Sequence, residues 1–147
     1  MRVNIYSVKQ VKEASGNYII DEAKINSPQS VDKLVRDSLD LHNESVEVFG
    51  ILALTTKNKI AGLHVISRGT LNSCIVHPRE VFKSAILNNA NTIIAFHNHP
   101  SGDTTPSNQD IEITKRLKQA GEVLGIELLD HIIVGDNFYS LKEGGYI

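Results

Sequence analysis

The sequence predicts an α/β or α+β sandwich, in which helices cover a central sheet. Two observations support this fold class. Strand-like segments alternate with helix-like segments along most of the chain. The run N-T-I-I-A-F-H, residues 91–97, is also short and apolar enough to be a central strand. The 147 residues are enough for one domain with a buried core.

The first half of the chain is expected to contain strands and one helix. Residues 2–25 are predicted to form short strands, because V-N-I-Y-S-V alternates and A-S-G-N is typical of a turn. Ser27 followed by Pro28 predicts a helix start, and apolar residues recur at helical spacing after it. Segments 46–55 and 60–67 predict a hairpin around T-K-N-K. We therefore expect a short N-terminal β extension over residues 1–27 and the main domain over residues 28–147.

The second half predicts two helices and further strands. L-N-S-C-I-V-H, residues 71–77, is expected to be a strand that ends at Pro78, and a helix should follow to about Ala90. A longer helix is expected from about Ser107 to Leu124, and residues 126–135 and 137–141 should form a strand and its hairpin partner. The inward faces of the two helices are predicted to carry Val81, Phe82, Ala85 and Ile86, and Ile111, Thr114, Leu117, Gly121 and Leu124.

Composition excludes several classes of protein. The chain is 41% hydrophobic and 22% charged, as in ordinary globular domains, and its net charge of -2 gives no support for a broad phosphate-binding surface. The single cysteine, Cys74, excludes an internal disulfide and a multi-cysteine zinc cluster, and is expected to be a buried structural thiol. The N-terminus does not resemble a secretory signal, and no apolar run is long enough to cross a membrane. We expect a cytoplasmic protein.

Two histidines stand one residue apart where the predicted central strand ends. Side chains at i and i+2 of an extended chain point to the same side, so His97 and His99 are expected to face one point while Asn98 faces away. A Gly/Pro-rich turn follows, and Asp110 lies in the first turn of the next helix. Two histidines and one carboxylate leave a zinc ion with a position open for water, as in catalytic sites. Bound zinc lowers the pKa of that water to about 7.

The same residues also have simpler interpretations. Ser107 with Asp110 three residues later resembles a capping box, in which Asp replaces the usual Glu. Both roles are compatible, because a cap fixes the direction of the helix and of its carboxylate. An isolated H-x-H is weak support for a metal site, and the prolines and glycine of the turn can simply shape a surface loop.

A hydrolytic site also needs a general base close to the reacting water. Glu47 is the first candidate, because it lies in the otherwise apolar segment S-V-E-V-F-G-I-L-A-L, where an acid is costly without a partner. The alternative for Glu47 is a solvent-facing strand residue. Glu44 is a second candidate for the base.

The stretch H-N-H-P-S-G-D-T-T-P-S-N-Q-D fits the pattern H-x-H-x7-S-x2-D, which is the signature of the JAMM (JAB/MPN+) metalloproteases. It resembles the RadC branch of that family in particular. The resemblance extends to R-G-T-L-N, V-H-P-R-E, N-N-A and L-D-H-I-I-V-G, and covers roughly residues 28–143.

This resemblance implies a cytidine-deaminase-like JAB/MPN fold, a central mixed sheet flanked by helices, with zinc held by His97, His99 and Asp110. It implies that Glu47 is the proton-transferring base and that Ser107 helps to hold the reacting water and the oxyanion. Larger RadC-type proteins carry a DNA-associated helix–hairpin–helix region before the matching part. About 27 residues precede it here, and they are predicted to be strands, so a DNA role does not follow from the resemblance.

Four further polar residues have two interpretations each. Asp130 and His131 can orient a metal ligand from behind, or form a satisfied buried pair that braces the sheet. Arg68 and Arg79 can bind a substrate carboxylate or phosphate, or form structural salt bridges.

The leading functional hypothesis is a zinc-dependent hydrolase of peptide or isopeptide bonds, acting on a peptide or protein substrate. The alternative is a DNA-repair-associated protein or a metal-dependent nuclease, although such nucleases often use two metals and the net charge is slightly acidic. A non-catalytic zinc scaffold is disfavoured because all four signature positions are intact. A 2-His-1-carboxylate iron oxygenase uses the same set of ligands.

Overall fold

The computed structural model of the protein describes residues 1–18, 25, 27–69 and 76–147. Within these residues lie three α-helices, a short 3-10 helix and five strands. In chain order they are α1 (Pro28–Leu39), η1 (Leu41–Asn43), β1 (Glu47–Leu54), β2 (Ile60–Gly69), α2 (Pro78–Leu87), β3 (Thr92–Asn98), α3 (Asn108–Leu124), β4 (Glu127–Val134) and β5 (Phe138–Ser140).

The five strands form one mixed sheet in the order β2-β1-β3-β4-β5. Strand β3 is central, antiparallel to β1 and parallel to β4, and the connection from β3 to β4 contains α3. The predicted hairpins β1–β2 and β4–β5 are both present and antiparallel. The predicted α/β class, with a mixed sheet flanked by helices, is therefore confirmed.

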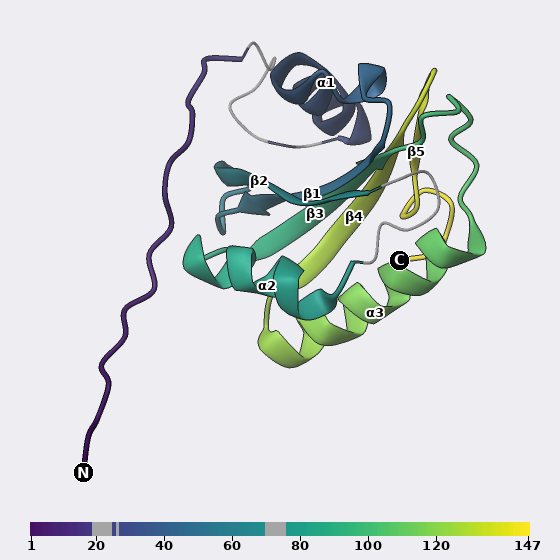
Figure 1. The fold of residues 1–147 in the computed structure, drawn as a ribbon. Helices are drawn as coiled ribbons and strands as arrows, with labels where there is room; N and C mark the ends of the chain where they lie inside the picture. The colour runs from purple at the N-terminus through teal and green to yellow at the C-terminus, as the bar shows by residue number, and fades with distance from the viewer. Residues whose placement is uncertain (19–24, 26, 70–75) are drawn as a thin grey trace.

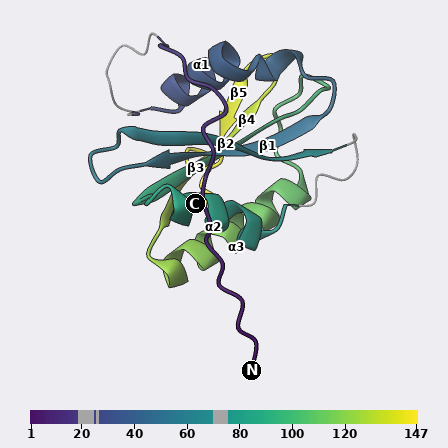
Figure 2. The same cartoon turned by 60° about the vertical axis from the view of Figure 1, so that its left-hand side comes forward.

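Helix α1 covers one face of the sheet, and α2 and α3 cover the other (Figures 1 and 2). Each face has its own apolar core, because successive side chains of a strand point to opposite faces. On β3, Ile94 and Phe96 pack in the core beneath α1, while Ile93 and Ala95 pack in the core beneath α2 and α3. All seven residues of β3 are buried, as expected for a central strand.

The helices begin and end where local chemistry favours it. The Ser27 hydroxyl accepts a hydrogen bond from the Ser30 N–H at 3.2 Å, and Pro28 occupies the first turn of α1. Helix α3 ends at Gly125, whose φ of 72° is the left-handed conformation that glycine adopts at little cost.

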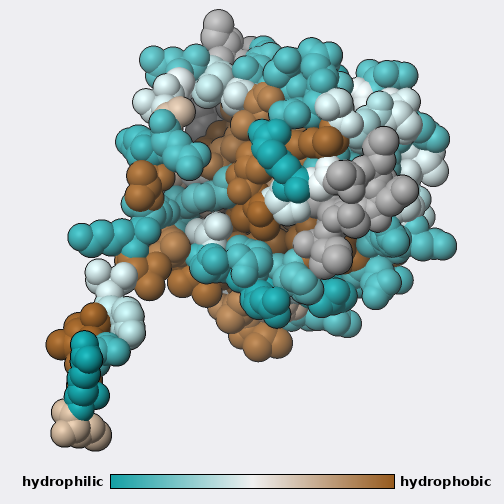
Figure 3. Space-filling model, in the orientation of Figure 1, coloured by the Kyte–Doolittle hydropathy of each residue, from teal (hydrophilic) through white to brown (hydrophobic). Residues whose placement is uncertain are grey.

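The N-terminal segment differs from the prediction. Residues 1–18 form no strand, and all of them are exposed, whereas residues 19–24 and 26 lie outside the described residues. Apolar side chains of this arm are exposed, among them Val3 and Ile5, and the arm extends away from the rest of the molecule (Figure 3). An alternating pattern predicts a strand only where a partner strand completes its hydrogen bonds, and here residues 1–18 have none.

Three other expectations need correction or lie outside the described residues. The sequence predicts Ile86 and Leu124 on inward helix faces, but they are 53% and 48% exposed, and both lie in the last turn of their helix. Val76 and His77 carry no strand, and the remainder of the strand expected over 71–77, including Cys74, lies outside the described residues.

In the described part of the chain, no helix has both the length and the apolar character needed to cross a membrane.

Candidate metal centre

The candidate site lies where β3 leaves the sheet, on the side covered by α2 and α3. The ring of His97 stacks on Phe49 with 6.1 Å between ring centroids, and Phe49 belongs to the core beneath these helices. Asn98 points to the opposite face, as the alternation predicts. The chain then turns through a loop that the His99 N–H anchors by a 2.9 Å bond to the Val134 carbonyl.

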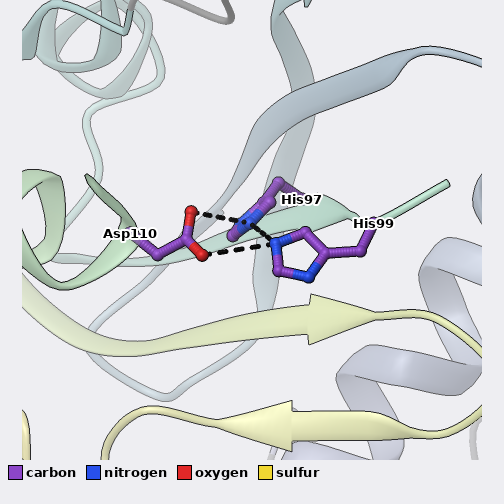
Figure 4. Close-up of side chains that lie close together, drawn as sticks. All are labelled: His97, His99 and Asp110. Atoms are coloured by element: carbon purple, nitrogen blue, oxygen red, sulfur yellow. Dashed lines mark hydrogen bonds and ion pairs between the residues drawn. The ribbon is translucent and has the colours of Figure 1, made fainter. Parts of the chain in front are cut away.

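The structure brings His97, His99 and Asp110 together (Figure 4). One potential ligand atom from each residue lies within 4.8 Å of the other two. The two Nε2 atoms of the histidines are 3.0 Å apart. Asp110 Oδ1 lies 3.1 Å from His97 Nε2, and its Oδ2 lies 3.3 Å from His99 Nε2. The three side chains therefore form a candidate metal-binding triad, built from the end of β3 and the start of α3.

The carboxylate of Asp110 is aimed by the cap of its own helix. Ser107 is the N-cap of α3, and its hydroxyl oxygen accepts from the Asp110 N–H at 3.1 Å. In return, Asp110 Oδ2 accepts from the Ser107 N–H at 2.7 Å. The capping box and the triad therefore coexist in one residue. The hydroxyl proton of Ser107 meets no acceptor among the described residues.

The ring of His99 is oriented by the loop. Its Nδ1 lies 2.7 Å from the Asp103 carbonyl oxygen, which can only accept, so Nδ1 carries a proton. Asp103 is itself held by the Thr105 N–H and hydroxyl, at 2.9 and 2.7 Å. With Nδ1 protonated, Nε2 is the nitrogen of His99 that faces the triad and can bind a metal.

Electrostatics favour an ionised carboxylate at this point. Burial alone would raise the pKa of Asp110, but hydrogen bonds from His97 and His99 outweigh it and hold the pKa well below its usual range. The hydrogen bond with Asp110 raises the pKa of His99, against the opposing effect of burial, and the Glu47 carboxylate adds to the rise. A concentrated negative field around two imidazoles suits a divalent cation.

Glu47 opens β1 and is half-buried. Phe49 pairs with His97 across β1 and β3, so Glu47, two residues earlier on the strand, shares the face of the sheet that carries His97 and His99. It lies outside the triad of ligand atoms. Glu44, the other candidate base, instead forms an ion pair with Arg68 at 2.6 Å.

Asn98 has a role that the sequence did not indicate. Its side chain is buried, its Oδ1 accepts from the Val48 N–H at 2.7 Å, and its Nδ2 donates to the carbonyls of Val46 at 3.0 Å and Glu44 at 3.3 Å. The amide therefore ties the segment on both sides of Glu47 to the strand that carries the histidines. The available signal was an amide at the end of a buried, largely apolar strand, since buried amides are almost always hydrogen-bonded.

Asp130 and His131 do different things: the first braces the sheet, and the second lies behind a residue of the triad. Asp130 braces the sheet, because its carboxylate accepts from the Ser140 hydroxyl at 2.6 Å and from the Lys142 N–H at 3.1 Å. His131 instead contacts His97, with 2.8 Å between His131 Nε2 and His97 Nδ1. Thr114 of α3 lies on its other side, 2.7 Å from His131 Nδ1. The sequence predicts Thr114 only as an inward-facing helix residue.

The arginines form ion pairs on the surface. Arg68 pairs with Glu44 as described, and Arg79 lies 4.0 Å from Glu80 with most of its side chain exposed. The salt-bridge interpretation therefore accounts for Arg68. Arg79 lies in the first turn of α2, next to its partner Glu80 in the sequence.

Comparison with known proteins places the chain in a family. The RadC-like JAB domain matches residues 25–146. The chain is 53% identical to a UPF0758 protein of Desulfitobacterium hafniense, in an alignment that covers 84% of this chain and 54% of the relative. It is 47% identical to a UPF0758 protein of Clostridium perfringens, covering 95% of this chain and 67% of the relative. A UPF0758 protein of Staphylococcus haemolyticus is 52% identical, covering 86% and 55%. The chain thus spans about half to two thirds of the length of these relatives.

Proposed function

Because this chain belongs to the RadC-like JAB domain family, we propose that it is a zinc-dependent hydrolase of peptide or isopeptide bonds. JAB domains generally have hydrolase activity. The observation that carries the proposal is the convergence of His97, His99 and Asp110 at the end of the central strand.

The donor set fits zinc in its catalytic form. Two imidazole nitrogens and one carboxylate are typical of zinc sites that keep a position for water or substrate, whereas structural zinc sites are closed by four protein ligands. Zinc held by this triad supplies a Lewis acid for the scissile carbonyl and lowers the pKa of water to about 7. Magnesium and calcium favour all-oxygen sites, which this triad does not provide.

Glu47 is proposed as the general base. It accepts a proton from the attacking water and passes it to the leaving amine, as a carboxylate on the same face as the histidines is placed to do. Glu47 is half-buried at the start of β1, on the face of the sheet that carries the histidines. The amide of Asn98 holds the backbone on either side of it.

Ser107 is proposed as the donor to the tetrahedral oxyanion. Its oxygen already accepts the N–H of Asp110, and that bond orients the hydroxyl without using its proton. Loss of one such donor typically slows turnover by about 10²- to 10³-fold.

The test uses the protein and Glu47→Gln side by side. Zinc content per chain is measured after purification without chelator, and hydrolysis is measured on peptides, isopeptide-linked peptides, and single- and double-stranded DNA. We expect about one zinc in both proteins, and cleavage of a peptide or isopeptide only by the protein with Glu47, because the base is not a ligand.

Three outcomes would contradict the proposal. If the purified protein contained no zinc, the proposed metal centre would be contradicted. Equal hydrolysis by Glu47→Gln would remove Glu47 from the mechanism. Cleavage confined to DNA, with salt-dependent binding, would replace the peptidase by a nuclease.

A further inference from the structure

We propose that His131 and Thr114 are positioning residues of the metal centre, which hold His97 in the one tautomer that can bind a metal through Nε2. This inference rests on the metal-binding part of the proposed function. His131 lies on β4 and Thr114 on α3, and neither residue belongs to the triad.

The contacts form a continuous chain of hydrogen bonds behind the triad. The Thr114 hydroxyl lies 2.6 Å from the Asp110 carbonyl oxygen and 2.7 Å from His131 Nδ1. His131 Nε2 lies 2.8 Å from His97 Nδ1. Both Thr114 and His131 are completely buried, with 0% of their surface exposed. No water therefore competes for these bonds.

The position of each proton follows from the Asp110 carbonyl oxygen, which is the one atom in this series of hydrogen bonds that cannot donate. The Asp110 carbonyl oxygen only accepts, so the single proton of the Thr114 hydroxyl points to it. The hydroxyl oxygen must then accept from His131, which places a proton on His131 Nδ1. The ring of His131 is fully buried, and its two nitrogens meet the Thr114 hydroxyl and the His97 ring rather than a carboxylate. A charge on such a ring would be costly, so the ring is neutral and its Nε2 has no proton.

His97 is the last member of the chain. Because His131 Nε2 accepts, His97 Nδ1 must donate, and a neutral His97 then carries its lone pair on Nε2. Nε2 is the nitrogen that faces His99 and Asp110. His99 reaches the same state by a simpler route, through the Asp103 carbonyl.

The hydrogen-bond chain also links β3 and α3, the two elements from which the triad is built, in a closed ring of contacts. Asp110 supplies its carboxylate to the triad and its backbone carbonyl to Thr114, one helical turn later. A shift of α3 against the sheet would therefore disturb both His97 and Asp110. Phe49 restricts the two rings further, stacked on His97 and edge-on to His131 at 5.4 Å.

A purely structural role for the buried pair makes a different prediction. If His131 and Thr114 only satisfied each other in the core, their loss would lower stability and leave zinc affinity unchanged. If they set the tautomer of His97, zinc affinity must fall even where the fold is intact, since partners of this kind are worth about 10- to 100-fold in metal affinity.

The test compares Thr114→Val with Thr114→Ser. Valine has the shape of threonine without its hydroxyl, whereas serine keeps the hydroxyl. Zinc affinity is measured by competition with a chromophoric chelator, and thermal unfolding of the zinc-free proteins gives their stability. We expect zinc to bind about 10- to 100-fold more weakly to Thr114→Val, and Thr114→Ser to retain affinity within about threefold of the parent, because the proton chain is restored.

Nitrogen-15 spectra of the imidazoles in the zinc-free proteins report the tautomers directly, because no metal then fixes the ring of His97. In the parent we expect protons on Nδ1 of both His97 and His131. In Thr114→Val we expect the His131 proton to move to Nε2, because its acceptor is gone.

Three results would overturn this inference alone. They are a parent His131 protonated on Nε2, a Thr114→Val variant with parental zinc affinity, or a Thr114→Ser variant as weak as Thr114→Val. Failure of the hydrolase proposal is separate: zinc binding without hydrolysis of any substrate would refute the activity, while the affinities and spectra still decide this inference. A parent that binds no zinc would overturn both.

Discussion

Substitution Asn98→Ala tests how the start of β1 is attached to the strand of the two histidines. The change deletes an acceptor for the Val48 N–H and a donor to the Val46 and Glu44 carbonyls. Val48 is 1% exposed, so water cannot replace the lost acceptor. The two carbonyls belong to half-buried residues and can be partly rehydrated.

The expected loss of stability follows from this accounting. A buried donor left without a partner costs about 1–3 kcal/mol, and each half-buried carbonyl costs less. We therefore expect a total loss of roughly 2–4 kcal/mol. At about 2–4 °C per kcal/mol for a chain of this size, the midpoint of thermal unfolding should fall by roughly 5–15 °C.

The assay is urea and thermal unfolding of the zinc-free protein, followed by circular dichroism. Asn91→Ala is the matched control, because Asn91 is exposed immediately before the same strand, and its loss should change stability by less than about 0.5 kcal/mol. A loss below about 1 kcal/mol in Asn98→Ala would refute the reasoning, since the three hydrogen bonds would then not hold this segment.

Three further changes test the site and its support. His97→Ala or His99→Ala should each abolish retention of zinc, measured as metal content after dialysis, and retained stoichiometric zinc would contradict the assignment of these ligands. Ser107→Ala should lower stability by about 1 kcal/mol through loss of the cap and slow turnover by about 10²- to 10³-fold, and loss of stability alone would restrict Ser107 to capping. Gly50→Ala should lower stability by about 1–3 kcal/mol in urea unfolding, because its Cβ would clash with the Phe96 ring and with the backbone oxygen of His64. An unchanged midpoint would show that both the ring and β2 can move away.

Most of the triad was predictable from the sequence because its geometry is local. The spacing of His97 and His99 needs only the period of a strand. The spacing of Ser107 and Asp110 needs only the hydrogen bonding of a helix start. Both patterns act over three residues or fewer, so the directions of these side chains follow from backbone geometry without knowledge of the fold.

The supporting residues were not predictable in this way. Thr114 is 17 residues from His131, and His131 is 34 residues from His97, so their contacts exist only once α3 and β4 pack together. The contact of Asn98 with Val48 spans 50 residues for the same reason. A sequence shows that such polar residues are inward-facing, but it does not show which partner satisfies them.

The sequence by itself thus determined most strands and helices of residues 28–147, the family, and the direction of each triad side chain from its own element, because periodicity and capping are properties of neighbouring residues. Only the tertiary structure decided which groups lie beside each buried histidine, which acid is tied up in an ion pair, and that residues 1–18 form no strand. These depend on hydrogen-bond partners that folding brings from distant parts of the chain, and a buried polar group is defined by its partner.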